Sequence, residues 1–319
     1  MAKLLKLNAG TVTEGVLSEP ASGGVVALND GSLQFFLGTA SGTTPGANII
    51  SPVAVSCANR MMLGVFEPDG DIEIQQPHFM NGSIGWNTTY GATTTVLTPV
   101  GAYRTLSVVG TATSRAFGTS NMYARAKKLG YVSAATAGSL VSLYTTTGMV
   151  TVGNGSGLGG FYKSIIFGIS DASAVSGARM FVGVSSTTGA PTNVEPSTLT
   201  NSIGVGHGAA DTNLKIFYGG SAAQTPIDLG VNFPSTTLST DIYKLELYST
   251  GNSSTNVYYK VTRLNTGNTA TGTLTDAGAG VQLPTPTTYL CHTRIFRTNN
   301  ATALAVGFDF FSDYIESNT

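Results

Sequence analysis

Charged residues are scarce in this chain. Asp, Glu, Lys and Arg make up 10% of its 319 residues and the formal net charge is −1, whereas charged side chains form about 25% of an average globular protein. A chain this neutral has little general attraction to nucleic acid. It also has no apolar run of the roughly 18 residues that a membrane-spanning helix needs. We therefore expect neither a nucleic-acid partner nor insertion into a membrane.

Cysteine is nearly absent as well, which limits disulfide and metal chemistry. The two cysteines, Cys57 and Cys291, lie far apart in the sequence, and each is predicted to be a buried, small apolar residue. Because no paired C-x₂-C spacing exists, neither a disulfide framework nor a structural zinc site is expected. We predict no cofactor.

The three histidines lack the sequence settings of a catalytic base. His78 follows a proline and is predicted in a loop, His207 lies between two glycines and is predicted at a loop tip, and His292 alternates within a strand. No G-x-S-x-G segment marks a serine nucleophile. We therefore predict that the protein is not an enzyme.

Glycine, threonine and serine are abundant instead. The chain has 40 Gly, 45 Thr and 30 Ser, and hydrophobic residues still reach 41%. That hydrophobic fraction suffices for a core and argues against disorder. Short segments rich in Thr, Val, Tyr, Phe and Ile alternate with turn residues, which is typical of strands. The sequence therefore predicts an all-β fold: a C-terminal antiparallel, jelly-roll-like β-sandwich, a smaller β-rich N-terminal domain and one short helix.

The composition along the chain divides it into four segments. The first contains Asn29-Asp30-Gly31 between two apolar runs, which is a hairpin signal. The third reads Gly-Asn-Gly-Ser-Gly-Leu-Gly-Gly and predicts a flexible hinge. The predicted segments are a β-rich domain at 1–80, a connecting region at 81–152, a glycine hinge at 153–160 and the sandwich at 161–319.

Two local patterns make sharper predictions. In the connecting region, apolar residues at helical spacing predict a helix over 121–129 that Ser120 caps and Gly130 ends. In the last strand, period-two alternation places Phe308 and Phe310 in the core. The same alternation places Asp309 and Asp313 together on the opposite face.

The sandwich segment resembles a jelly-roll-like module of bacteriophage tail fibres and other virion appendage proteins. The resemblance covers about residues 80–319 and is carried by strands and turns. Its motifs are Gly159-Gly160-Phe161 to Asp171, Arg179 to Ser186, Ile203-Gly204-Val205-Gly206, Tyr243 to Leu247, Val306-Gly307-Phe308-Asp309 and Tyr314-Ile315-Glu316, with Leu129 to Ser139 similar to the stretch before the module.

This resemblance implies a virion protein, a fibre or spike whose C-terminal sandwich is exposed for attachment to the host surface. A cell-surface glycan is the implied host partner, and residues 1–80 are expected to attach to other virion structural proteins. Low charge and the abundance of Gly, Thr and Ser, together with the resemblance, also predict a homotrimer.

Aromatic residues are the best candidates for ligand contact. Trp86 and Tyr90 lie in a Gly/Asn/Thr-rich segment. Trp86 is a candidate stacking platform or subunit-interface anchor, and a core position at a domain junction is its alternative. We add His207 as a third ligand-binding candidate. Asp69, Asp71 and Glu73 alternate, so a metal site there is left open while no metal is predicted.

Two other functions remain open at this point. One is a capsid head fibre or decoration protein that stabilises the shell without binding a receptor. The other is an exopolysaccharide depolymerase, which would need paired carboxylates in a cleft. The absence of acidic residues between Glu73 and Asp171 speaks against the depolymerase.

Overall fold

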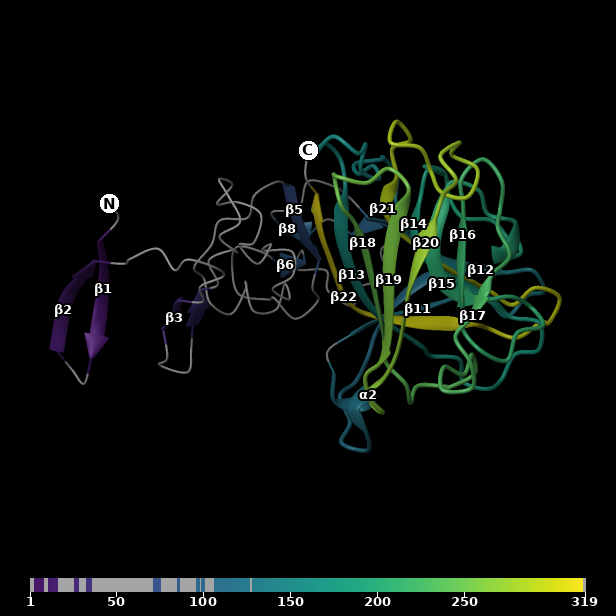
Figure 1. Ribbon diagram of the computed structural model, residues 1–319. Coiled ribbons are helices and arrows are strands. Elements are labelled where there is room, and N and C mark those ends of the chain that lie inside the picture. Colours follow the sequence, from purple (N-terminus) through teal and green to yellow (C-terminus); the bar gives the residue numbers. More distant parts are fainter. Residues whose placement is uncertain are drawn as a thin grey trace. The chain divides into compact units, whose positions relative to one another are not determined.

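A computed structural model describes residues 106–126 and 128–317 continuously, together with strand residues 3–8, 11–16, 26–28, 33–35, 71–75, 85–86, 96–97 and 99–100. The chain divides into two compact units, Met1–Glu67 and Pro68–Thr319. Most of the described residues belong to the second unit, and its two β-sheets are shown in Figure 1.

The first sheet of the second unit has eight strands, and all of its pairings are antiparallel. Its order is β10 (Thr111–Ser114), β11 (Leu129–Val132), β22 (Gly307–Ser317), β13 (Phe161–Ile169), β18 (Tyr243–Ser249), β19 (Asn256–Arg263) and β20 (Asn268–Thr275), with β5 (Asp71–Gln75) beside the far half of β22.

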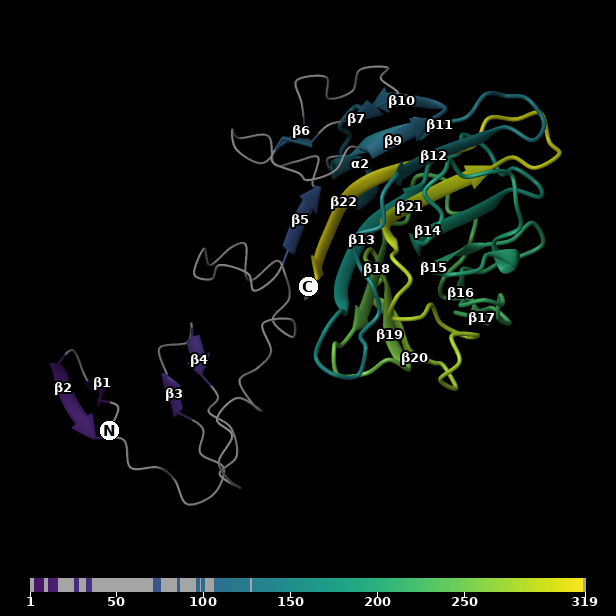
Figure 2. The same ribbon diagram turned by 90° about the horizontal axis from the view of Figure 1, so that it is seen from above.

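The second sheet also has eight strands in antiparallel register. Its order is β17 (Ile227–Asp228), β16 (Lys215–Gly219), β15 (Ser202–His207), β14 (Arg179–Ser185), β21 (Cys291–Thr298), β12 (Leu140–Thr145), β9 (Leu106–Val109) and β7 (Val96–Leu97). Figure 2 shows the strands of the two sheets as two layers.

The core lies between these layers and follows from the period-two alternation of the strands. On β18, for example, Tyr243, Leu245 and Leu247 are buried while the residues between them are partly exposed. Core residues come from both sheets and form one continuous cluster. The prediction of an all-β, two-sheet antiparallel sandwich is therefore confirmed, and its strands lie close to where the sequence places them.

The last strand, β22, confirms one half of a prediction and corrects the other. Phe308 and Phe310 are fully buried, and Asp309 faces the opposite side of the sheet. Asp313 does not join Asp309, because the register shifts at a β-bulge around Phe311. The bulge adds one extra residue to β22, so each later residue faces the side of the sheet opposite to the predicted one. Asp313 therefore points into the sandwich instead of away from it.

The predicted helix exists but is shorter than expected. α2 runs over Met122–Arg125, and Asn121, not Ser120, caps it by accepting a hydrogen bond from the amide of Ala124 at 2.7 Å. The predicted end at Gly130 is wrong because Leu129 and Gly130 already belong to β11. Among the described residues, no helix is long and apolar enough to cross a membrane.

The glycine segment at 153–160 is not a hinge between domains. The strands before it, β9 to β12, belong to the same two sheets as the strands after it, so the predicted boundaries at 81–152 and 161–319 divide one unit. The amides of Gly155 and Gly157 donate to the carbonyl of Gly251, at 3.0 and 3.1 Å. Gly160 has φ +92°, and a Cβ there would lie 2.6 Å from the Ser249 carbonyl oxygen. These glycines therefore permit close backbone packing.

Apart from β5 and β7, which join the two large sheets, the described residues before 106 form short antiparallel pairs. The hairpin signal at Asn29-Asp30-Gly31 is confirmed, since β3 (Val26–Leu28) pairs with β4 (Leu33–Phe35). The remaining pairs are β1 (Lys3–Asn8) with β2 (Thr11–Val16), and β6 (Gly85–Trp86) with β8 (Pro99–Val100).

Candidate binding surface

Three tyrosines cross the outer face of the first sheet in one row. Tyr162 on β13 stands opposite Tyr248 on β18, which stands opposite Tyr258 on β19. Their sequence neighbours on each strand are core residues, so period two turns all three rings away from the core. We call these three residues the tyrosine row.

The rings of the row are positioned by contacts with their neighbours. Tyr248 and Tyr258 stack with centroids 6.0 Å apart and an interplanar angle of 26°. Tyr162 meets Tyr314 of β22 edge-on at 6.3 Å. Tyr258 is 41% exposed. An amphipathic ring that is held by a neighbour and open to water on one side is suited to contact a ligand at low entropic cost.

A small charged group adjoins the tyrosine row. Glu246 accepts hydrogen bonds from the Tyr162 hydroxyl at 2.6 Å and from Lys244 Nζ at 2.8 Å, and Lys260 Nζ lies 3.9 Å away. Burial by itself raises the pKa of Glu246, but the hydrogen bonds from Lys244 and Tyr162 together with the charges of Lys244 and Lys260 outweigh burial and lower it. The carboxylate is therefore ionised at neutral pH. Lys260 is 49% exposed and leaves donors for a ligand.

Threonines continue this face beyond the tyrosines. Thr273 on β20 stands opposite Tyr258, and the outward-facing threonines of β20 are exposed. They are Thr269, Thr271, Thr273 and Thr275. Each hydroxyl both donates and accepts hydrogen bonds, so the outer face of the first sheet combines aromatic rings, two lysines, a carboxylate and a line of hydroxyls.

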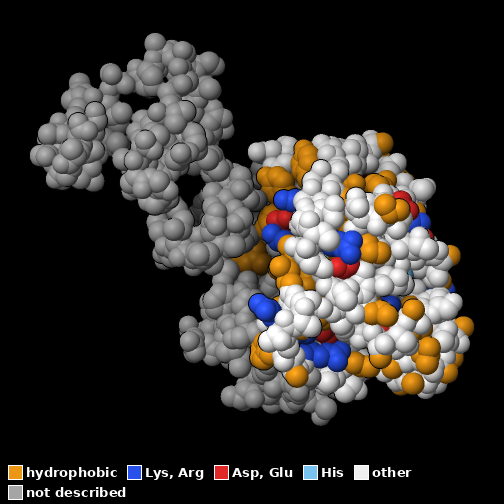
Figure 3. Space-filling view, turned by 90° about the horizontal axis from the view of Figure 1, so that it is seen from below, with side chains coloured by type: hydrophobic (Ala, Val, Ile, Leu, Met, Phe, Trp, Pro, Cys, Tyr) orange, Lys and Arg blue, Asp and Glu red, His pale blue; other side chains and the backbone are white. Residues whose placement is uncertain are grey.

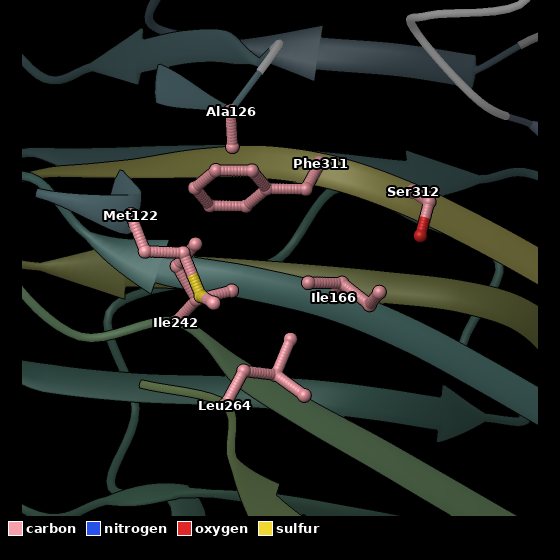
Figure 4. Close-up of a pocket in the computed structure, with 7 residues that line it drawn as sticks. All are labelled: Met122, Ala126, Ile166, Ile242, Leu264, Phe311 and Ser312. Carbon is pink, nitrogen blue, oxygen red and sulfur yellow. The ribbon is translucent and has the colours of Figure 1, made fainter. Parts of the chain in front are cut away.

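An apolar hollow lies on the same outer face, near α2. Its volume is about 370 Å³, and Figure 4 shows the side chains that line it. They are Met122, Ala126, Ile166, Ile242, Leu264, Phe311 and Ser312. Since Ser312 carries the one hydroxyl in this lining, the hollow offers few groups that could hydrogen-bond a polar ligand.

A partly buried polar contact lies near Tyr123 of α2. Arg115 Nε donates to Asp309 Oδ1 at 2.8 Å and Arg115 also donates to the Ser170 hydroxyl at 3.0 Å. Burial raises the pKa of Asp309, against the lowering effect of Arg115. Tyr123 of α2 lies over the sheet and meets Phe311 edge-on at 5.3 Å. This contact fixes the helix against the outer face.

His207 is not at a loop tip, because it ends β15 and is 3% exposed. Burial, and next the charge of Arg297, lower its pKa to about 3, so the ring is neutral. Its Nδ1–H then donates to the Gly208 carbonyl at 3.1 Å and its Nε2 accepts from Arg297 at 2.6 Å. Arg297 in turn forms a buried pair with Asp171. This geometry gives His207 a structural role in the core.

The other sequence candidates lie apart from the tyrosine row or outside the described residues. Trp86 is in strand β6, opposite Pro99, while Tyr90, His78, Cys57 and Asp69 are outside the described residues. His292 and Cys291 are buried in β21, as predicted. Asp71 and Glu73 lie in β5. Among the residues that the structure describes, no group of three His, Cys, Asp or Glu side chains could hold a metal ion.

The tyrosine row was not predicted from the sequence, although a signal for it exists. Each of the three tyrosines lies at an outward-facing position of a strand whose inward-facing positions are mostly apolar. Which strands are neighbours cannot be read from that alternation, because the row requires residues nearly a hundred positions apart to lie side by side.

Figure 3 shows a described face of the molecule on which charged side chains are few. They lie in small groups in which blue and red adjoin, between wide uncoloured and hydrophobic areas. The Glu246 group beside the tyrosine row follows this pattern of local charge pairing. A ligand of this surface would therefore meet local hydrogen-bonding groups and not a broad field of one sign.

Comparisons with known proteins give similarity of fold at low identity. No protein-family model and no curated protein matches the chain. Among solved structures, lectin II from Ulex europaeus is 12% identical, with 69% of this chain and 94% of that chain covered and a TM-score of 0.44. Arcelin-5, a lectin-like defence protein from Phaseolus vulgaris, is 9% identical, with 78% and 98% covered and a TM-score of 0.43.

A protein of unknown function from Shewanella oneidensis MR-1 is also similar, at 14% identity, with 87% of this chain and 98% of that chain covered and a TM-score of 0.43. Identities and scores at this level transfer no site or ligand to the present chain. The resemblance to virion appendage modules stays a prediction.

Proposed function

We propose that this protein is a non-catalytic attachment protein of a virion fibre or spike and that its sandwich binds a host-surface glycan on the outer face of the first sheet. The observation that carries the binding proposal is the tyrosine row. The exposed ring of Tyr258, which Tyr248 backs on one side, offers apolar surface to a sugar. Beside them, Lys260 and the threonines of β20 offer donors and acceptors to sugar hydroxyls.

The non-catalytic part of the proposal is supported by the state of the carboxylates. Glu195 and Asp211 both approach Gly208, but Glu195 is paired with Arg179 at 2.6 Å and Asp211 with Lys215 at 2.6 Å. Carboxylates bound in this way are poor candidates for a general acid and a nucleophile or base in glycoside cleavage.

The binding test uses single tyrosine variants and host-surface polysaccharide as the probe, with affinity measured by calorimetry. Tyr258→Ala is expected to weaken binding about twofold to twelvefold, since an aromatic contact contributes about 0.5–1.5 kcal/mol. Tyr289→Ala is the matched control, because Tyr289 is also exposed, at 64%, but is not part of the row. Equal losses in both variants, or no loss in either, would refute this binding surface.

The same incubation separates binding from cleavage. The polysaccharide recovered afterwards is expected to keep its chain length, and shortened chains would instead indicate a depolymerase. The assembly proposals are a homotrimer, attachment of residues 1–80 to other virion proteins, and a location in the virion. Light scattering of the purified protein tests the trimer, and immunoelectron microscopy of particles tests the location.

A further inference from the structure

A lysine lies inside the hydrophobic core of the sandwich. Lys163 occupies β13 between the inward-facing residues Phe161 and Ile165 and has 0% exposure. Lysine is almost never fully buried unless it has a partner. Its position on the apolar side of a central strand is therefore a feature that needs a chemical explanation.

The partner is an acid that the β-bulge turns inward. Asp313 on β22 stands opposite Ile165, so it is the diagonal neighbour of Lys163 on the adjacent strand. Lys163 Nζ contacts Asp313 Oδ1, and the Asp313 side chain is 1% exposed. An amine and a carboxyl group are thus held against each other in a site without bulk water.

A residue of the opposite sheet, Thr293, holds the second oxygen of that carboxyl group, and its neighbour His292 contacts the Thr293 hydroxyl. The Thr293 hydroxyl donates to Asp313 Oδ2 and lies 3.4 Å from Lys163 Nζ. His292 Nδ1 is 2.9 Å from the Thr293 hydroxyl and 3.9 Å from Asp313 Oδ2. A hydrogen-bonded chain therefore leads from His292 through Thr293 to the oxygen that faces away from the lysine contact.

We propose that Lys163 and Asp313 condense to form an intramolecular isopeptide bond that joins β13 to β22. The ammonium group first gives a proton to the carboxylate, which leaves a neutral amine beside a carboxylic acid. Lys163 Nζ then attacks Asp313 Cγ, and a second proton passes from nitrogen to Oδ2. Oδ2 also takes up the first proton as the C–Oδ2 bond breaks, so that water leaves and the C=Oδ1 group of the amide remains. Both hydrogens of the water come from the lysine, so the step needs no other reactant.

The site favours this reaction in two physical ways. Fixed contact between the reacting groups replaces a bimolecular encounter, which raises the effective concentration greatly. A dry interior also disfavours two separated charges, so both the neutral pair and the uncharged amide relieve a desolvation cost. Thr293 acts on the reacting group by donating a hydrogen bond to Oδ2, and His292 positions the Thr293 hydroxyl.

The second buried ion pair of the core gives an internal contrast. Arg297 and Asp171 are each about 1% exposed and in direct contact, but a guanidinium group stays protonated and is not a nucleophile. The proposal therefore predicts the loss of one water molecule from the chain and not two.

The test is the intact mass of the purified full-length protein under denaturing conditions. The expected mass is one water molecule below the mass of the sequence. A mass equal to that of the sequence would overturn the proposal and leave Lys163 and Asp313 as an ion pair. Lys163→Arg is the matched control, because it keeps the positive charge but has no amine that can be acylated, and its mass is expected to equal its sequence.

Digestion with trypsin locates the bond. Acylated Lys163 is not cleaved, so the peptide 129–179 is expected to stay intact and to be joined to the C-terminal peptide 298–319. Fragmentation distinguishes Asp313 from Asp309 within that second peptide. A linkage at Asp309, or separate peptides 129–163 and 164–179, would contradict the assignment.

The role of Thr293 is tested separately from the bond itself. Thr293→Val keeps the shape of the side chain but removes the hydroxyl, and it is expected to leave a fraction of uncondensed chains that declines with time after synthesis. Thr293→Ser retains the hydroxyl and is expected to condense fully. Complete condensation of the valine variant would remove Thr293 from the mechanism while the bond between Lys163 and Asp313 stands.

Discussion

Removal of the strands before the glycine segment is expected to unfold the sandwich. A fragment that begins at residue 159 lacks β9, β10, β11 and β12. β12 lies between β21 and β9 in the second sheet, and β11 pairs with the first half of β22 in the first. The truncation therefore removes the last strands at one end of each sheet. It also uncovers the inner faces that those strands would cover.

The magnitude follows from the core side chains that the fragment loses. Leu106, Leu129, Tyr131, Val141 and Leu143 are all at most 1% exposed and belong to the main core cluster. At about 1.5–3 kcal/mol for each buried side chain, their removal costs about 8–15 kcal/mol. Since a folded domain is stable by only about 5–15 kcal/mol, the loss matches or exceeds the whole stability of the unit.

The assay compares urea unfolding of fragment 159–319 with that of fragment 68–319, which corresponds to the second compact unit. Circular dichroism should show one cooperative transition for the longer fragment and none for the shorter one. A cooperative transition of the shorter fragment, with a slope in proportion to its length, would refute the reasoning. It would show that the strands at 106–145 are accessories to a sandwich that folds without them.

Three further predictions concern single residues. Phe308→Ala should lower the free energy of unfolding by about 3–5 kcal/mol, whereas Leu304→Ala, at a site 43% exposed, should change it by less than about 0.5 kcal/mol in the same urea titration. Because burial lowers the pKa of His207 to about 3, its neutral ring stabilises the fold above pH about 6.5, and this contribution is lost as the pH falls toward 3. His207→Gln should therefore flatten the pH dependence of the melting temperature over that range, and an unchanged slope would refute the linkage. Gly160→Ala, at φ +92° with backbone atoms 2.6 Å from the new Cβ, should cost more than about 1 kcal/mol, while Gly189→Ala meets nothing within 4 Å and should leave the melting temperature unchanged.

The strands of the sandwich could be predicted because each carries its own signal. The alternation in β13, β14, β18 and β19 depends only on local residue order, and burial of one face follows from it. The hairpin at Asn29-Asp30-Gly31 was likewise determined by the turn residues. In both cases the information needed lies within about ten residues, so no knowledge of distant partners was required.

The errors arise where distant contacts decide the outcome. A run of glycines by itself predicts a hinge. Here the glycines have no side chains in the way, so the backbone of residues 249–251 packs closely against them. Alternation along β22 predicts that Asp313 faces outward, but the β-bulge turns it to the inner face of the sheet. His207 between two glycines has the composition of a loop tip, yet Arg297, ninety residues away, binds its ring in the core. None of these partners is visible in the local sequence.

The two faces of the first sheet carry the two proposed sites, so each proposal can be tested without disturbing the other site. Lys163 and Asp313 point inward and Tyr248 and Tyr258 point outward from the same set of strands. A change in the tyrosine row removes no core contact, so it should alter binding while the chain still loses one water molecule relative to the mass of its sequence. Lys163→Arg should do the reverse. If one variant changed both properties, the alternation of faces along β13, β18 and β19 could not be the physical basis of both.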